Sequence, residues 1–328
     1  MVMFWVAILA VATLLYVLLD GFDLGVGMLF GLTGDDARRR AMMNAVAPVW
    51  DGNETWLVAS GVVLWGAFPI VYATLISAFY LPVLVMVAGL ILRGVAFEFR
   101  HKAVHLRWLW DAGFAGGSLA AAFIQGLMVG GLVEGLPIVG GRYIGGEFGW
   151  FSPFAVLCGV GLCIGYALLG ACWLVKKCEA NLRDWAYRLI PYLAAGLLTF
   201  LLVVFAYALA ENLAVMSRWL ERPYLFALPA IGAVAAAVAG FSVRRRRDAV
   251  PFAAVLMIFA VAFGTLAISF WPYMVPFSVT IEEAAAPHSS LAFMFWGAGL
   301  FIFPLMLVYT VVSYAVFRGK LQSTEIHY

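Results

Sequence analysis

The chain has 328 residues, of which 65% are hydrophobic and only 12% are charged. A soluble globular protein carries roughly a quarter of its residues as charged side chains, and no water-soluble core could hold so much apolar material. The formal net charge of +2 is too small and too scattered to indicate nucleic-acid binding. These quantities exclude an ordinary soluble enzyme and predict a polytopic membrane protein.

Nine apolar stretches are long enough to cross a bilayer, which needs about 20 such residues per helix. We expect spans near 3–31, 51–69, 74–97, 112–133, 153–175, 189–211, 224–243, 251–271 and 291–317. The second span is the weakest because Asp51, Asn53 and Glu54 stand at its start, and the break before the third rests on Pro69. The first apolar run has no basic segment before it and no small-residue cleavage site, so we expect it to stay as a span.

The predicted fold is all-α, with one integral membrane domain over residues 1–328. Nine spans suit two four-helix bundles, in approximate halves 1–133 and 153–271, and one peripheral extra helix at 291–317. Small residues four positions apart allow helices to approach closely in lipid, and glycine pairs with that spacing recur along the chain. We therefore expect glycine-lined packing faces between several of the spans.

Lysine and arginine residues predict the orientation, because short cytoplasmic loops carry an excess of both. With nine spans, alternate loops hold 16 of these residues, whereas the opposite loops hold only three, Arg142, Arg218 and Arg222. This places the N-terminus outside and the C-terminus in the cytoplasm. Dropping the second span would put Arg38 to Arg40 on the N-terminal side and would spoil the alternation.

Cysteines and histidines give little sign of metal or haem binding. The cysteines show neither CxxC spacing nor histidine companions, so disulfide or metal chemistry is not expected; they are Cys158, Cys163, Cys172 and Cys178. Haem inside a helical bundle usually takes a histidine from a spanning helix. The histidines all fall in predicted loops or tails, at His101, His105, His288 and His327. We expect no haem or metal in this chain.

Carboxylates inside membrane helices are costly unless they are paired, hydrated or protonated, so each is a functional hypothesis. Three consecutive spans carry charged residues in pairs, in order Asp20 with Asp23, Asp51 with Glu54, and Arg93 with Glu98. The first two pairs have a spacing of three, which places both members on one helix face. All three pairs fall on the predicted cytoplasmic side. Such a grouping is typical of a proton relay.

Plainer interpretations exist for the same residues. Arg93 can simply neutralise one aspartate, and Asp51 or Glu54 can cap a helix N-terminus. Trp50 stands at the predicted membrane boundary, where tryptophan is commonly an interfacial anchor. A proton-coupled secondary transporter would also use intramembrane acids and an arginine, although near the bilayer midplane. A purely structural membrane subunit is the third alternative.

The sequence around these residues resembles a known family. The runs Asp20–Gly27, Asn44–Leu57, Phe79–Pro82 and Arg93–Arg100, with the later segments Phe270–Pro276 and Thr280–Ala285, are similar to subunit II of cytochrome bd quinol oxidases. Together they extend over most of the chain, and the Trp50-Asp51-Gly52-Asn53 run is specific. The sequence looks most like the short branch described as cyanide-insensitive.

The resemblance implies a heterodimer in the respiratory electron-transport chain of a bacterial inner membrane. The partner, subunit I, would carry two b-type haems and haem d, oxidise quinol near the outer face and reduce oxygen to water with cytoplasmic protons. Subunit II would have a nine-helix fold, bind no haem and pack against subunit I across a large interface. The resemblance also allows a structural quinone in this chain, bound lipids, and a small single-helix accessory subunit.

Residue roles are implied in the same way. Asp51 would be the entrance or first proton carrier and Glu98 a second carrier, whereas Trp50, Asp20 and Asp23 would order or hydrate the path near the subunit interface. Arg93 would support it. Other members have histidine, glutamine and aspartate where this sequence has Val49, Glu54 and Glu98. Glu54 is then either an added carrier or a helix cap.

Overall fold

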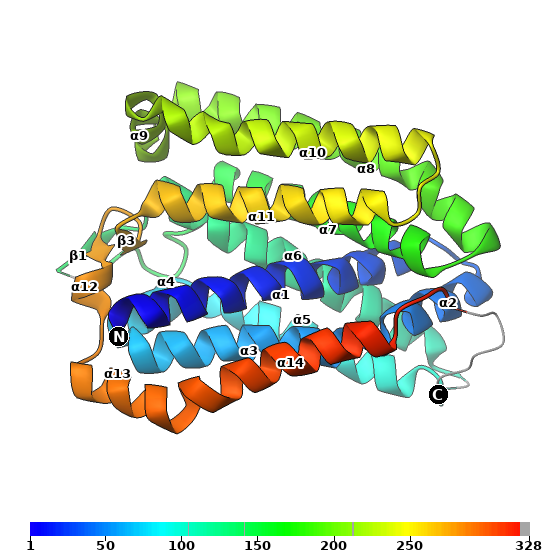
Figure 1. Cartoon of the computed structure of the whole chain (residues 1–328), viewed down its shortest axis with the longest axis horizontal. Helices are drawn as coiled ribbons and strands as arrows, with labels where there is room; N and C mark the ends of the chain where they lie inside the picture. Colours follow the sequence, from blue (N-terminus) through cyan, green and yellow to red (C-terminus); the bar gives the residue numbers. More distant parts are fainter. Residues whose placement is uncertain (104, 141, 212, 322–328) are drawn as a thin grey trace.

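Long helices lie side by side along one direction in the computed structural model (Figure 1), which describes residues 1–103, 105–140, 142–211 and 213–321. Within these residues, eight helical segments are long and apolar enough to cross a membrane, and a bent helix pair can supply a ninth. The prediction of an all-α polytopic membrane protein is confirmed.

The main helices of these eight segments are α1 (Val2–Phe30), α5 (Tyr80–Phe99), α6 (Arg107–Glu134), α7 (Pro153–Lys177), α8 (Ala180–Ala210), α10 (Ala227–Arg244), α11 (Val250–Phe270) and α14 (Leu300–Val316). The other helices are α2 (Asp36–Val46), α3 (Trp50–Ala67), α4 (Pro69–Ala78), α9 (Ala214–Glu221), η1 (Pro223–Phe226), α12 (Ile281–Ala284), α13 (His288–Met294) and the π-helical turn η2 (Phe295–Gly299). Two small antiparallel hairpins pair β1 (Ile138–Val139) with β2 (Arg142–Tyr143), and β3 (Tyr273–Val275) with β4 (Val279–Thr280).

The predicted second and third spans differ most from the structure. Helices α3 and α4 are bent by 119° relative to each other at the break before Pro69. They are long and apolar enough to cross a membrane only as a bent pair. Proline excludes helical backbone at the preceding residue, and Phe68 accordingly has φ −134° and ψ 60°. The break at Pro69 was predicted correctly. A third span starting at residue 74 was wrong, because residues 69–78 form α4 and α5 begins at Tyr80.

Helix ends were also misplaced where they are polar. Helix α8 begins at Ala180 rather than at 189, and α6 begins at Arg107 rather than at 112. Hydropathy detects the apolar part of a span and misses charged turns that continue the helix into water. His288 begins α13, so its assignment to a loop was wrong, whereas the tail residue His327 lies outside the described residues.

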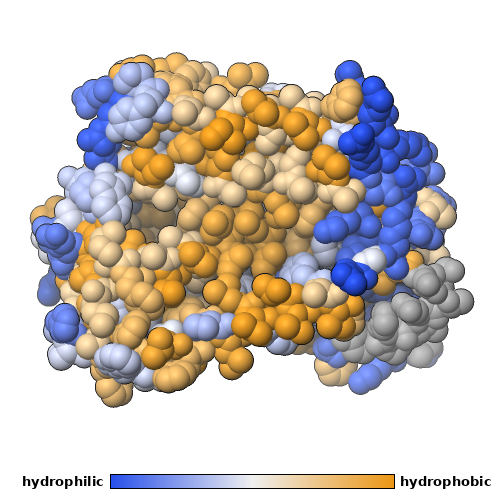
Figure 2. Space-filling view, in the orientation of Figure 1, coloured by the Kyte–Doolittle hydropathy of each residue, from blue (hydrophilic) through white to orange (hydrophobic). Residues whose placement is uncertain are grey.

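Helix α1 packs against α3, α6 and α7. Its closest approach is to α7, where a Cβ added at Gly25 would lie 1.8 Å from the Tyr166 carbonyl oxygen. The glycine pair Gly21 and Gly25 therefore forms a packing face, as its spacing predicts. The surface carries a broad apolar band between two polar ends (Figure 2), as expected for a protein surrounded by lipid.

The two polar ends differ in charge. One end carries α2 and the segments 100–103, 105–107, 176–183 and 244–248, and we call it the basic end. The opposite end carries α9, α12 and both hairpins (Figure 1). At the basic end, the buried Arg100 guanidinium pairs with Asp111 and, at 2.8 Å, with Asp36. The hydrogen bond from Arg100 lowers the pKa of Asp36 below its ordinary value. These ion pairs fasten α2 to the ends of α5 and α6.

Candidate functional site

Three helices bring opposite charges together inside the apolar bundle. Arg93 of α5 is 2% exposed, and its Nη2 lies 2.8 Å from Oδ1 of Asp20, a fully buried residue of α1. The same nitrogen lies 3.3 Å from Oε2 of Glu54 on α3, whose side chain is 25% exposed. One guanidinium nitrogen therefore serves two carboxylates. Because isolated buried charges are costly, this pairing is what allows Asp20 to remain inside the bundle.

A second group of hydrogen bonds holds Asp23, one turn along α1 from Asp20. Nδ2 of Asn53 donates to Oδ2 of Asp23 at 2.7 Å and to the carbonyl oxygen of Leu19 at 3.3 Å. The Tyr314 hydroxyl, from α14, donates to Oδ1 of Asn53 at 3.1 Å. This group links α1, α3 and the last helix of the chain.

A third polar chain extends from Asp20 in the other direction. The Tyr16 hydroxyl, one turn before Asp20 on α1, lies close to the Asp20 carboxylate. Nε2 of Gln125 donates to the Tyr16 hydroxyl at 2.7 Å, and the Tyr166 hydroxyl donates to Oε1 of Gln125 at 3.1 Å. All three residues are buried, and they join α1, α6 and α7. Buried polar side chains thus extend from Arg93 and Asp20 toward Tyr166.

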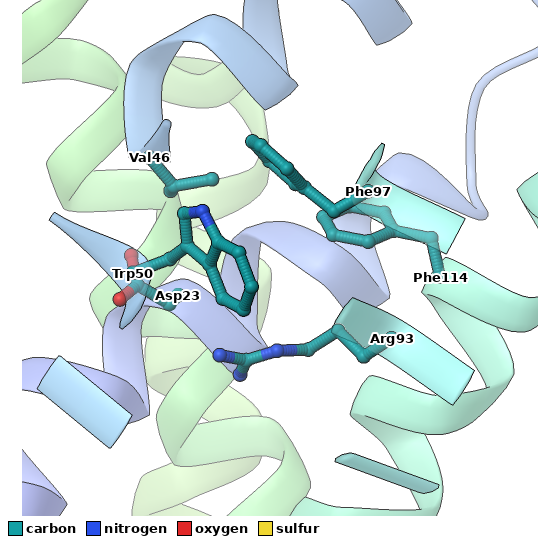
Figure 3. A pocket seen from close by; sticks show the side chains of 6 residues that line it. All are labelled: Asp23, Val46, Trp50, Arg93, Phe97 and Phe114. Atoms are coloured by element: carbon teal, nitrogen blue, oxygen red, sulfur yellow. The ribbon is translucent and has the colours of Figure 1, made fainter. Parts of the chain in front are cut away.

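Trp50 covers the charged cluster. The Arg93 guanidinium lies 5.9 Å from the centre of the Trp50 ring, within cation–π range. The Trp50 and Phe97 rings pack at 5.1 Å, and a narrow gap between them is also lined by Asp23, Arg93 and others (Figure 3). Figure 3 shows the guanidinium beside the Trp50 indole. The tryptophan is therefore part of the cluster rather than an isolated membrane anchor.

Asp51 and Glu98 lie outside the buried cluster. Both are exposed, and neither carboxylate forms a salt bridge or side-chain hydrogen bond with the described residues. They directly follow Trp50 and Phe97 in the sequence, and the rings of those two residues are in contact. Of the seven residues selected from sequence, Asp20, Asp23, Glu54, Arg93 and Trp50 are gathered together, and the two assigned as carriers lie at the surface.

Three buried atoms within the cluster have no hydrogen-bond partner among the described residues: Oδ2 of Asp20, Oδ1 of Asp23 and Nη1 of Arg93. Buried polar atoms of folded proteins are normally paired, and exceptions are concentrated at functional sites. These atoms lie next to groups that can accept or release a proton. Atoms of this kind mark the cluster as a candidate functional site.

Sequence reasoning missed several members of this site. Asn53 lies within the Trp50-to-Asn53 run, so its place in the motif was the only signal for it. Tyr16, Gln125 and Tyr166 lie in apolar stretches where a lone polar residue is easily taken for packing, and Tyr314 is 261 positions from its partner. Their roles depend on tertiary contacts.

The fold and the site define a polytopic membrane subunit with a buried carboxylate–arginine cluster near its basic end. The family model described as cytochrome bd terminal oxidase subunit II matches residues 1–317. A Haemophilus influenzae protein named "Probable cytochrome oxidase subunit 2" is 32% identical over 365 residues, covering 98% of this chain and 95% of that protein. The Escherichia coli (strain K12) protein named "Cytochrome bd-I ubiquinol oxidase subunit 2" is 29% identical over 363 residues, with coverage of 98% and 95%.

The chain belongs to the cytochrome bd terminal oxidase subunit II family. It is therefore a membrane subunit of a bacterial respiratory oxidase, and this membership implies subunit I as its partner. The solved bd oxidase of Geobacillus thermodenitrificans contains a chain with the same fold, at a TM-score of 0.76 and 17% identity, covering 95% of this chain and 98% of that one.

Proposed function

We propose that this chain is the haem-free subunit II of a bd-type quinol oxidase, and that it delivers protons toward the site of oxygen reduction. The Escherichia coli and Bacillus subtilis relatives are named as subunits of ubiquinol oxidases, which supports quinol as the reductant. Two b haems and one d haem in subunit I would supply the redox chemistry. A single membrane domain, a structural quinone and a small accessory subunit stay predictions.

Haem ligands are proposed to come from the partner because this chain's donors do not suit a haem inside the bundle. Of the histidines that the structure describes, His101 and His105 lie in the α5–α6 connection and His288 begins α13, and all three are exposed. A haem between helices needs an axial ligand that points inward.

The basic end is proposed to face the cytoplasm and the N-terminus the outside. The excess of lysine and arginine at that end supports this orientation, since such residues are retained on the cytoplasmic side. The acidic cluster lies toward the same end, because Asp20 and Asp23 stand in the last third of α1 and Asp51 and Glu54 at the start of α3. The protons consumed in oxygen reduction would thus be taken from the cytoplasm.

The proposed route begins at the two exposed acids. Asp51 takes a proton from water at the surface, and Glu98 is a second exposed carrier. Glu54 stands one turn along α3 from Asp51 and is half-buried, so it joins the surface to the interior. The proton then reaches the cluster of Asp20, Asp23 and Arg93, from which it continues toward subunit I.

Arg93 has a defined task in this route. Its Nη2 contacts both Asp20 and Glu54, so a proton arriving at one carboxylate changes the pairing of the other. The convergence of these three side chains inside an apolar bundle, next to the basic end, is the observation that carries the proposal. A transporter site near the midplane is not favoured by this placement.

Two experiments test the proposal. A reduced-minus-oxidised spectrum of the purified complex, with mass identification of its chains, should show a haem d band and a haem-bearing partner. Asp51→Asn should then reduce oxygen consumption by about 10²-fold, as expected for loss of a proton-transfer group, with haem content retained. Glu221→Gln, an exposed acid of α9 at the opposite end, is the matched control. Normal turnover of a normally assembled Asp51→Asn complex would instead favour a purely structural subunit.

A further inference from the structure

The amide of Asn53 has only one orientation that satisfies its neighbours. The carbonyl oxygen of Leu19 can only accept a hydrogen bond, so the atom 3.3 Å from it must be the amide nitrogen. That nitrogen also lies 2.7 Å from Oδ2 of Asp23, to which it donates its second hydrogen. Oδ1 of Asn53 is left to accept the hydrogen of the Tyr314 hydroxyl, 3.1 Å away. Asn53 is 1% exposed, so water does not compete for these bonds.

Tyr314 is itself held in place by the helices around it. Its ring packs edge-on against Phe22 of α1 at 6.5 Å and against Trp173 of α7 at 6.1 Å. Helices α3 and α14 are joined by a second hydrogen bond, from Nε1 of Trp56 to Oγ1 of Thr310 at 3.2 Å, which fixes α14 against α3. The hydroxyl of Tyr314 is therefore aimed at Asn53 by packing that does not depend on Asn53.

The two oxygens of Asp23 consequently differ. Oδ2 accepts the Asn53 N–H, whereas Oδ1 has no hydrogen-bond partner among the described residues. Asp23 also lines the narrow gap beside Trp50, Arg93 and Phe97 (Figure 3). The charged or titratable groups that face it are Asp20, Arg93, Glu54 and Tyr314. Because the amide N–H already points at Oδ2, an added proton is held on Oδ1.

We propose that Asn53, held in one orientation by Tyr314, is a positioning residue that directs proton exchange at Asp23 to Oδ1, the oxygen that Asn53 does not contact. This inference rests on the proposed role in proton delivery and adds a directional element to it. Without the hydrogen bond from Tyr314, the Asn53 amide can rotate and the proton of Asp23 is shared between the two carboxylate oxygens. Exchange with the cluster then becomes slower, although the carboxyl group is still present.

The test compares variants of the whole purified complex by oxygen consumption in H2O and in D2O at saturating quinol. Asn53→Leu should lower the rate by about tenfold, a loss within the range for a misplaced proton-transfer geometry, and should increase the solvent isotope effect. Tyr314→Phe keeps the packed ring and removes only the hydroxyl, so a loss of about threefold is expected. The double variant should match Asn53→Leu alone, because Tyr314 acts through Asn53.

Tyr309→Phe is the matched control, since Tyr309 lies on α14 against Gly52 of α3, is exposed, and its hydroxyl makes no hydrogen bond with the described residues. It should leave both the rate and the isotope effect unchanged. Losses that simply add in the double variant would overturn the inference, as they would show two independent packing defects. If Asn53→Leu does not assemble, Tyr314→Phe decides, and a wild-type rate with an unchanged isotope effect would overturn it.

Asp23→Asn separates failure of this inference from failure of the proposed function. Full activity in Asp23→Asn would remove Asp23 from the proton route and overturn this inference, whereas the proposed function would fail only if Asp51→Asn also kept full activity. A large loss in Asp23→Asn together with a normal rate and isotope effect in Asn53→Leu would reject only the positioning role. Loss in both, with the isotope effect raised in Asn53→Leu, is the result that we expect.

Discussion

Replacing Arg93 with glutamine tests the buried ion pairs most severely. The substitution leaves Asp20, which has no exposed surface, without its cationic partner, whereas Glu54 is 25% exposed and can turn toward water. Removing one member of a buried ion pair destabilises a protein by about 3–5 kcal/mol, because the remaining charge is buried without compensation. Most of that loss should come from Asp20. We therefore expect Arg93→Gln to lower the melting temperature of the purified complex by several degrees.

The double variant Arg93→Gln with Asp20→Asn makes this prediction specific. With both charges removed, the remaining loss should fall to about 1–2 kcal/mol, since two neutral amides can still form a hydrogen bond. Thermal unfolding followed by circular dichroism in mild detergent measures all three variants, and Arg142→Gln, exposed at the opposite end, is the control. A double variant as unstable as the two single losses combined would refute the ion-pair argument.

Further predictions concern packing and the surface network at the basic end. Gly25→Ala should destabilise the complex by about 1–3 kcal/mol, because its Cβ would lie 1.8 Å from the Tyr166 carbonyl oxygen, whereas Gly61→Ala, with open space around its Cα, should be nearly neutral in the same melting assay. Equal effects of the two substitutions would contradict the close α1–α7 contact. Burial raises the pKa of Asp248, but hydrogen bonds from Arg183, Lys320 and Tyr187 outweigh it and hold this pKa at about 2 instead of 3.8. A carboxyl group whose pKa is lower in the folded state stabilises that state when the pH is above its unfolded pKa. This stabilisation is lost as the pH falls through the folded pKa, and at neutral pH it is worth about 2 kcal/mol. The melting temperatures of the wild type and Asp248→Asn should differ by a constant amount above about pH 5 and converge below it; a difference that persists unchanged to pH 3 would show that these bonds are not the cause.

Composition and hydropathy were sufficient to predict an all-α polytopic membrane protein, because the bilayer sets the length and polarity of each span directly. They were not sufficient at the α3–α4 bend, where Pro69 was recognised as a break but residues 74–78, the second half of α4, were joined to the next span. They also misplaced the start of α8, since nothing in an apolar window reports a helix that continues through Arg183 and Asp184. Helix geometry beyond the membrane depends on contacts with other segments.

The candidate site was partly accessible from sequence. Charges within apolar stretches are rare enough that Asp20, Glu54 and Arg93 could be selected individually, and the structure pairs them. Spacing along the chain could not show that Asp51 and Glu98 would be exposed while their neighbours Trp50 and Phe97 pack together. Nor could it connect Asn53 to Tyr314, because that contact exists only after α14 has packed against α3.

Proton uptake during a single turnover tests the central claim most directly. The reduced complex would be mixed rapidly with oxygen while a pH-sensitive dye follows proton uptake and the optical spectrum follows the haems, in the wild type and in Asp51→Asn. We predict that Asp51→Asn slows proton uptake by about tenfold or more while oxygen binding keeps its wild-type rate. Proton uptake at the wild-type rate in a fully assembled Asp51→Asn complex would contradict delivery through this subunit.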